Sequence, residues 1–182
     1  MNRIIKCAAP QYLNESLDLV ERVFTDSEGE KSGKIVRSLV EEIRSKRFYV
    51  PELELVMVDE NDCVIGYAMF SKFHLEGKYE NQLLLLSPVA VETKLQRQHI
   101  SKELIEEGFA IAIKMGYEAV IVEGNPQNYN PRGFKTSCNY GIVAGTKIGI
   151  PSVECLMVKE IVEGSLEKIK GTVDYSDYEY LT

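Results

Sequence analysis

Residues 83–104 read LLLLSPVAVETKLQRQHISKEL and join an apolar strand, through a short polar turn, to the start of an amphipathic helix. A helix that begins at such a turn leaves its first backbone N–H groups without intrahelical partners, pointing beyond the carboxyl end of the strand. That place suits an anion, often a phosphate. Pro88 removes one N–H donor from the strand. We therefore expect a bulge there and a strand that is locally separated from one neighbour.

Length and charge narrow the class of protein. The chain has 182 residues, of which 45% are hydrophobic, which suits one substantial core and a single domain. The formal net charge is -7, and the clustered lysines and arginines that bind nucleic-acid backbones are missing. We therefore expect no nucleic-acid partner.

The cysteines and the apolar stretches indicate the compartment. Cys7, Cys63, Cys138 and Cys155 are far apart and show neither a CxxC pair nor a zinc-type spacing, so we interpret them as reduced thiols and expect no metal. No apolar stretch reaches the roughly 20 residues that span a bilayer, and residues 1–9 lack a signal-peptide pattern. The sequence thus predicts a cytoplasmic protein without a membrane partner.

Hydrophobic periodicity sets the expected order of elements. Helices are expected at about 11–24, at a second stretch that ends in the basic cluster 44–47, and from the turn before residue 100 to Gly116. Loops are expected at 25–33, 76–81 and 124–134, the last with at most one helical turn, and an irregular surface tail at 164–182. Strands are expected at 3–8, 53–58, 64–73, in the apolar run from residue 83, and at 119–122, 137–148 and 154–160. This order predicts an α/β fold with one central mixed sheet and helices on both faces.

That order, together with the segments PVAVETKLQRQHISKELI and EGNPQNYNPRGF, resembles the GNAT family of N-acetyltransferases, which use acetyl-CoA. The likeness extends to about Tyr175, since IPSVECLMVKEI and EGSLEKIKGTVDY are similar to the closing segments of one bacterial branch. The resemblance implies a GNAT fold with a mixed sheet of about seven strands. It also implies one GNAT-like domain at residues 1–160, followed by a C-terminal tail at 161–182.

The resemblance also implies where acetyl-CoA, the acyl donor, would bind. The strand after Pro88 would offer free amides to the pantetheine arm, and the strand-to-helix turn would hold the pyrophosphate. His99 and Ser101 stand where the family has glycine or, at the second position, alanine, so the site is either retained in altered form or degraded. The expected cofactor-binding residues are Val89, Ala90, Val91, Gln96, Arg97, Gln98, His99, Ile100, Ser101 and Asn125.

Two catalytic roles follow from the same resemblance. The loop pattern of the family is matched at Gly124, Pro126, Tyr129, Gly133 and Phe134, whereas asparagines replace its acid and its first aromatic residue. Tyr129 is therefore the candidate general acid for the departing thiolate. Glu123 is the first candidate for the general base, and the spacing leaves Glu92 and Glu54 open. A backbone N–H of Val89 or Ala90 would stabilise the oxyanion.

Two functions of different classes remain. One is an N-acetyltransferase that transfers an acetyl group from acetyl-CoA to a primary amine of a small molecule or a peptide. The other, which the lost turn glycines favour, is a catalytically degraded GNAT-fold module that acts as an acyl-CoA sensor or as a protein-interaction domain. The sequence leaves a homodimer open and does not identify the acceptor amine.

Overall fold

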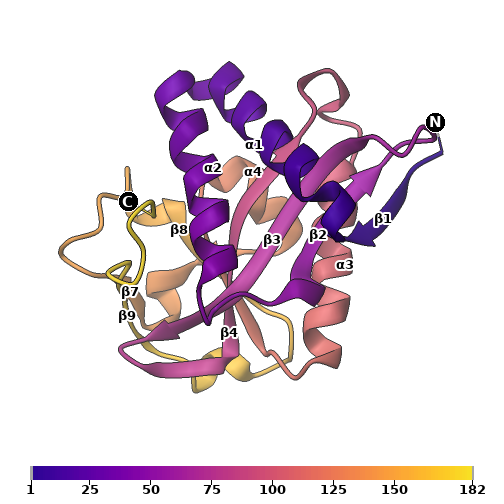
Figure 1. Ribbon diagram of the computed structural model, residues 1–182. Coiled ribbons are helices and arrows are strands. Elements are labelled where there is room, and N and C mark those ends of the chain that lie inside the picture. Colours follow the sequence, from indigo (N-terminus) through magenta and orange to yellow (C-terminus); the bar gives the residue numbers. More distant parts are fainter. Residues whose placement is uncertain (1, 182) are drawn as a thin grey trace.

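The computed structural model describes residues 2–181 and contains one seven-stranded mixed sheet with helices on both faces (Figure 1). The strand order is β1-β2-β3-β4-β5-β8-β6, and neighbouring strands are antiparallel except for β4 and β5, which are parallel. The strands are β1 (Ile4–Cys7), β2 (Glu54–Val58), β3 (Val64–Leu75), β4 (Lys78–Val91), β5 (Ala119–Glu123), β8 (Leu156–Glu160) and β6 (Lys135–Thr136). The expected α/β class with a mixed sheet is confirmed.

Two helices cover one face of the sheet and a third covers the other. Helices α1 (Leu13–Glu28) and α2 (Glu30–Ser45) lie in front of β3 in Figure 1, and α3 (Ile100–Lys114) lies behind the sheet. Each helix buries an apolar stripe at helical spacing, such as Leu17 and Val20 of α1 against one core and Leu104 and Ile105 of α3 against the other. The sheet thus separates two hydrophobic cores.

The expected loop at 25–33 is wrong over most of its length. Residues 25–28 continue α1, and only Gly29, with φ of 99°, separates it from α2. Polar residues do not stop a helix whose other face is buried, whereas a glycine with positive φ does. The two helices approach closely at Gly33, where a Cβ would lie 2.1 Å from Thr25 Oγ1. This hairpin of helices forms one wall of a cavity beside the sheet.

The expected loop at 76–81 is also wrong, because β3 and β4 form a long hairpin. Only Glu76 and Gly77 form the turn, with φ of 53° and 80°, and β4 begins at Lys78. Positive φ at both turn residues matches the right-handed twist of the flanking strands. Residues 78–82 are polar because this part of β4 is partly exposed. Because these residues are polar, hydrophobic periodicity does not indicate that they form a strand.

The C-terminal third differs most from expectation. The expected strand at 137–148 is a 3₁₀ turn at Ser137–Tyr140 followed by β7 (Ile142–Ala144), which pairs with β9 (Gly171–Val173) in a separate two-stranded sheet. Of the expected irregular surface tail at 164–182, the irregular backbone is confirmed for residues 174–181, whereas residues 165–167 form a 3₁₀ turn and residues 171–173 form β9. The expected surface position is wrong for Tyr175 and Tyr178, which are buried in the core. The loop at 124–134, with its short helix α4 (Pro126–Tyr129), is confirmed.

The bulge expected at Pro88 is confirmed, and it opens the sheet. Ala68 of β3 pairs with Val89, whereas Phe70 pairs with Leu86, so two residues of β4 oppose one residue of β3. On its other side, β4 pairs with β5 only over Leu83–Leu85. From residue 86 onward β4 has β3 as its only paired neighbour within residues 2–181. The two parallel strands therefore separate toward their carboxyl ends.

Candidate active site

A cavity of about 690 Å³ opens where β4 and β5 separate. This volume lies in the range of small-molecule sites, roughly 300–1,000 Å³. Four parts of the chain form its walls: the α1–α2 hairpin, the bulged part of β4, the loop after β5 and the C-terminal segment. The residues that line it include Glu28, Lys31, Val89, Glu123, Gly124, Asn125, Tyr129, Tyr175 and Tyr180.

Tyr129 reaches the cavity because α4 begins directly after β5. Asn125 Oδ1 accepts a hydrogen bond from the Gln127 N–H at 2.9 Å and caps the helix. The Tyr129 ring packs edge-on against Phe134, with ring centroids 5.5 Å apart, and covers Gly124, where a Cβ would lie 2.6 Å from the ring. Burial raises the pKa of the Tyr129 hydroxyl, so it remains protonated at neutral pH and holds a proton that it can donate.

Glu123 ends β5 and lines the same cavity. Its Oε2 accepts a hydrogen bond of 2.9 Å from the hydroxyl of Tyr175. Partial burial raises the pKa of the Glu123 carboxyl, and the hydrogen bond from Tyr175 opposes this shift. A carboxylate with a raised pKa accepts a proton more readily near neutral pH. The structure thus brings together the two side chains for which the sequence predicted catalytic roles.

The two other acids that spacing left open lie outside this cavity. Glu92 forms an ion pair with Arg22 at 2.7 Å. Glu54 is fully buried and accepts hydrogen bonds from Arg44 Nε at 3.0 Å and from the Tyr67 hydroxyl at 2.8 Å. Glu54 therefore belongs to a buried polar network between α2 and the sheet. Of the three acids considered from the sequence, Glu123 is the one that lines the cavity with Tyr129.

The turn before α3 keeps the backbone conformation that favours glycine. Arg97 and His99 have φ of 64° and 66°, in the left-handed region. The His99 side chain is exposed. No side chain of residues 2–181 caps the start of α3 by a hydrogen bond, which leaves its first N–H groups open to an anion.

The strand beyond Pro88 presents further backbone donors. Val89, Ala90 and Val91 pair with Ala68, Tyr67 and Gly66 of β3. Successive N–H groups of a strand point to alternate sides. Since β5 is not paired with this part of β4, some of these N–H groups face the opening between the two strands. Of the three residues, Val89 lines the cavity itself.

Arg132 is a candidate site residue that the sequence did not reveal. Its Nη2 donates to Ser101 Oγ at 2.8 Å and its Nη1 donates to the Asn128 carbonyl, whereas its Nε is buried without a partner among the described residues. A guanidinium has five N–H donors, so this one retains capacity for an anion at the first turn of α3. Nothing in the spacing of the NPRGF segment indicated this contact, because it joins residues far apart in the chain.

Comparison with known proteins identifies the family. A model of the acetyltransferase (GNAT) family matches residues 17–138. The chain belongs to the GNAT acetyltransferase family. It is 28% identical over 141 residues to YhbS of Escherichia coli K12, an uncharacterised N-acetyltransferase, and the match covers 77% of this chain and 80% of YhbS.

Solved structures of GNAT proteins share the fold. The structure of E. coli YhbS in complex with CoA is similar with a TM-score of 0.85 and 25% identity, covering 99% of this chain and 92% of that one. A GNAT acetyltransferase of Brucella melitensis in complex with acetyl-CoA has a TM-score of 0.62 and 29% identity, covering 74% and 83% of the two chains. The family and the fold implied by the sequence resemblance are thus confirmed.

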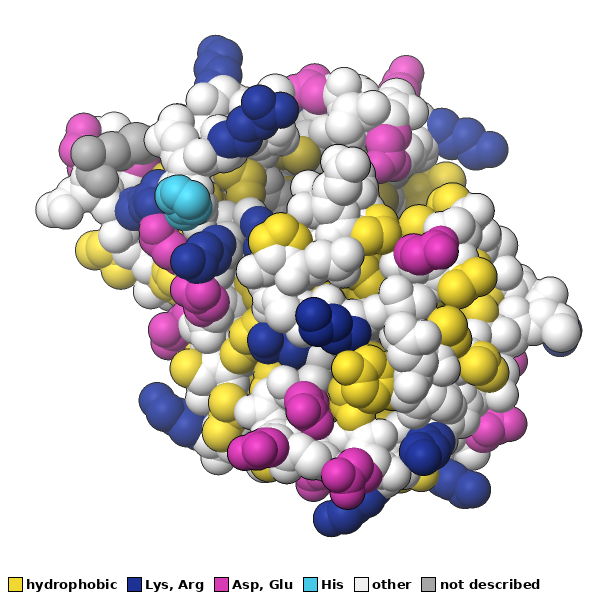
Figure 2. Space-filling view, turned by 180° about the vertical axis from the view of Figure 1, so that it is seen from behind, with side chains coloured by type: hydrophobic (Ala, Val, Ile, Leu, Met, Phe, Trp, Pro, Cys, Tyr) yellow, Lys and Arg dark blue, Asp and Glu magenta, His cyan; other side chains and the backbone are white. Residues whose placement is uncertain are grey.

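The surface charges and the character of the helices bear on possible partners. In the face opposite to that of Figure 1, basic and acidic side chains are interspersed (Figure 2). Among the helices of residues 2–181, none combines the length and the apolar character that crossing a bilayer requires. The expectations about partners and compartment stay predictions.

Proposed function

We propose that this protein transfers an acetyl group from acetyl-CoA to a primary amine of a small molecule or a peptide. The observation that carries the proposal is the cavity between the separated strands β4 and β5, whose wall holds both Glu123 and Tyr129. The CoA and acetyl-CoA complexes of the related GNAT structures support the choice of acyl donor.

The residues around the turn before α3 fit the donor. The open N–H groups of α3 and the guanidinium of Arg132 suit the pyrophosphate of acetyl-CoA. The exposed side chains of residues 96–98 lie at the same turn. The backbone donors of Val89–Val91 suit the amide groups of the pantetheine arm. Asn125 acts here by holding α4 and hence Tyr129 in place.

The proposed reaction removes two protons from the ammonium group and delivers one proton to the departing sulfur. Acetyl-CoA supplies a thioester, whose carbonyl carbon the amine attacks. Glu123 takes the proton of the ammonium group, directly or through water, so that the nitrogen lone pair is free. The C–N bond forms and the C–S bond breaks, while a backbone N–H of Val89 or Ala90 donates to the acyl oxygen. Tyr129 gives its proton to the departing sulfur, and the nitrogen loses its second proton to the Tyr129 phenolate, directly or through water, as the amide forms. Glu123 releases the first proton to solvent, so both side chains return to their starting forms.

His99 supports a second candidate function, a GNAT-fold sensor that binds acyl-CoA without transferring the acyl group. The side chain stands at a left-handed position where a glycine would let phosphate oxygens approach more closely. A looser grip on the donor would lower the rate of transfer without abolishing binding. The sensor is therefore distinguished by binding that is not followed by reaction.

Incubation with acetyl-CoA and a panel of primary amines tests the proposal. Free CoA should be measured by chromatography rather than with a thiol reagent, because Cys7, Cys63 and Cys138 are exposed and would react. We expect CoA release that depends on the amine. A protein that binds CoA in a calorimetric titration but releases none with any amine would favour the sensor.

A further inference from the structure

The C-terminal segment 174–181 forms one wall of the proposed active site. Tyr175, Tyr180 and Leu181 line the cavity together with Glu123 and Tyr129. In Figure 1 this segment, drawn in yellow, passes beside α2. The segment follows β9, whose pairing with β7 fixes its starting point at Val173. The last residues of the described chain therefore complete the site instead of extending away from it.

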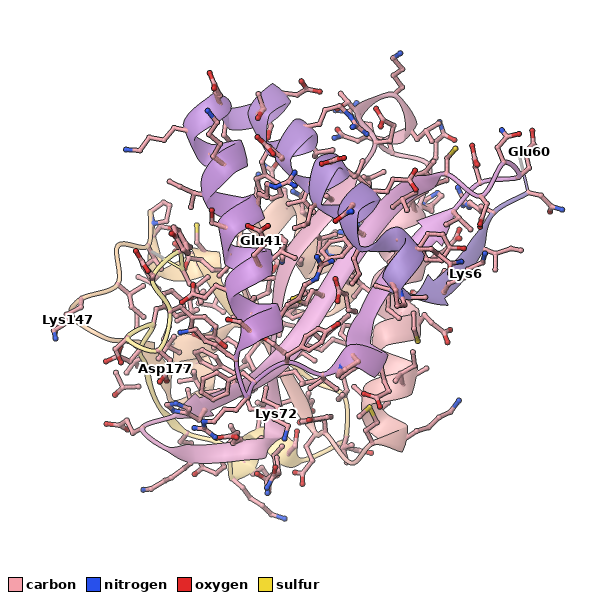
Figure 3. All side chains as sticks on the ribbon, in the orientation of Figure 1. Lys6, Glu41, Glu60, Lys72, Lys147 and Asp177 are labelled. Carbon is pink, nitrogen blue, oxygen red and sulfur yellow. The ribbon has the colours of Figure 1, made fainter. Side chains whose placement is uncertain are left out.

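Helix α2 and strand β3 hold this segment in place. The Glu42 carboxylate accepts hydrogen bonds from the N–H groups of Glu179 at 2.8 Å and Tyr180 at 3.1 Å. Lys46 donates to the Asp177 carbonyl, and Asp177 Oδ2 lies 2.7 Å from His74 Nε2. Figure 3 shows Asp177 on the left, near the end of α2, on the side where Figure 1 marks the C-terminus. The segment is thus fixed at several points around its tyrosines.

Tyr175 is the side chain that this arrangement directs at the proposed base. Its ring is buried and packs edge-on against Phe73, with ring centroids 6.2 Å apart. Its hydroxyl donates to Glu123 Oε2 at 2.9 Å. A ring fixed by packing holds its hydroxyl in one place, so the hydrogen bond fixes one oxygen of the carboxylate and leaves Oε1 for another partner.

We propose that Tyr175 is a positioning residue, whose hydroxyl orients the Glu123 carboxylate and favours its charged form so that Glu123 Oε1 can accept the proton of the amine. This inference rests on the role of Glu123 in the proposed function. It adds that the C-terminal segment, by way of Tyr175, controls the base.

The loss of the Tyr175 hydroxyl should change the pKa of Glu123 in one direction. Burial disfavours the charged form of Glu123, and the hydrogen bond from Tyr175 favours it. Removing the hydroxyl alone should therefore raise the pKa of Glu123. The other charged or titratable groups that line the same cavity are left unchanged by this substitution. They are Glu28 and Lys31 of the α1–α2 hairpin, Tyr129 of α4 and Tyr180 of the C-terminal segment.

Tyr178 offers a matched control on the same segment. It is buried and packs against Phe48, with ring centroids 5.8 Å apart, but its hydroxyl has no hydrogen-bond partner among the described residues. Tyr175→Phe and Tyr178→Phe therefore remove the same atom from two buried rings. Only the first loses a hydrogen bond to Glu123.

A carboxyl ¹³C NMR titration tests the positioning role without any substrate. The Glu123 signal is assigned by its absence in Glu123→Gln. In Tyr175→Phe we expect the titration midpoint of Glu123 to rise by about one pH unit, a common size for pKa shifts in proteins. In Tyr178→Phe it should stay where it is in the unchanged protein. An unmoved midpoint in Tyr175→Phe, or an equal movement in both variants, would overturn the proposal.

Kinetics separates this inference from the proposed function. With the panel amine that releases most CoA, the low-pH limb of kcat/KM should move to higher pH in Tyr175→Phe by the same amount, which lowers the rate on that limb about tenfold. A purely structural defect would lower kcat/KM equally at every pH. If CoA is released but the limb does not move, the positioning role fails. If the NMR midpoint moves but no amine releases CoA, the proposed function fails instead.

Discussion

Arg132 Nη2 donates a hydrogen bond of 2.8 Å to Ser101 Oγ, so the loop after β5 contacts the first turn of α3. The same loop carries Tyr129, which lines the cavity between β4 and β5. This hydrogen bond therefore connects the expected anion-binding turn to the loop that carries the candidate general acid. An anion held at α3 would also help to fix the position of Tyr129.

Arg132→Ala should weaken CoA binding about tenfold or more, since a hydrogen bond to a charged group contributes roughly 1.5–3 kcal/mol. Calorimetric titration with CoA measures the change. Arg47→Ala is the control, because Arg47 forms an exposed ion pair with Glu80, and neither residue lines the cavity. The assignment of Arg132 fails if both variants bind CoA as the unchanged protein does.

His99→Gly should stabilise the fold. A left-handed residue with a Cβ costs roughly 1–2 kcal/mol, whereas the extra backbone freedom of glycine in the unfolded chain costs roughly 0.5–1 kcal/mol. The difference lies at about 0–1.5 kcal/mol, and its midpoint corresponds to a rise in Tm of roughly 1–3 °C for a chain of this size. Thermal unfolding measures it.

His99→Ala is the matched control, because it removes the imidazole and keeps the Cβ at the same positive φ. It should not raise Tm. If the two variants melt alike, the backbone conformation of this residue is not the source of the effect. Tighter CoA binding by His99→Gly alone would show that the turn glycine, and not the loss of the imidazole, improves the grip on phosphate.

Tyr129→Phe should lower kcat with little change in KM for acetyl-CoA. General acid catalysis contributes typically about 10²–10⁴-fold, and the phenylalanine ring preserves the packing against Phe134. Single-turnover measurement of CoA release checks this. A rate of release equal to that of the unchanged protein would remove Tyr129 from the role of proton donor.

Glu54→Gln should destabilise the fold by about 3–5 kcal/mol, because it leaves the largely buried Arg44 without its carboxylate partner. Glu92→Gln breaks a more exposed ion pair with Arg22 and should cost no more than about 1 kcal/mol. Urea unfolding of the two variants measures the difference. Similar midpoints for both would contradict the assignment of Glu54 to a buried network.

The local features of the site could be predicted from the sequence. Pro88 indicated the bulge because a missing N–H is a property of one residue, and the turn before Ile100 followed from the change of periodicity. The contacts of Arg132 with Ser101 and of Tyr175 with Glu123 could not be predicted in this way. They join residues far apart in the chain, and only the folded sheet brings them together.

The strand errors near the C-terminus have a related cause. The strand expected at 137–148 is only three residues long, as β7, and its partner β9 was missed, because the two pair across a long stretch of sequence. A short strand whose partner is so distant shows little pattern of its own. The tyrosines among acids in the tail at 164–182 indicate surface structure, but Tyr175 and Tyr178 are buried. Tertiary contacts decided their structure.

Amine-dependent release of CoA, followed by chromatography in the unchanged protein and in Glu123→Gln, distinguishes a transferase from a binding protein. The proposed mechanism predicts release that requires both acetyl-CoA and an amine. It also predicts that replacing the base lowers the rate by a factor of about 10² or more. Contradiction would be an unchanged protein that binds CoA yet releases none with any amine, or a Glu123→Gln variant that is as fast as the unchanged protein.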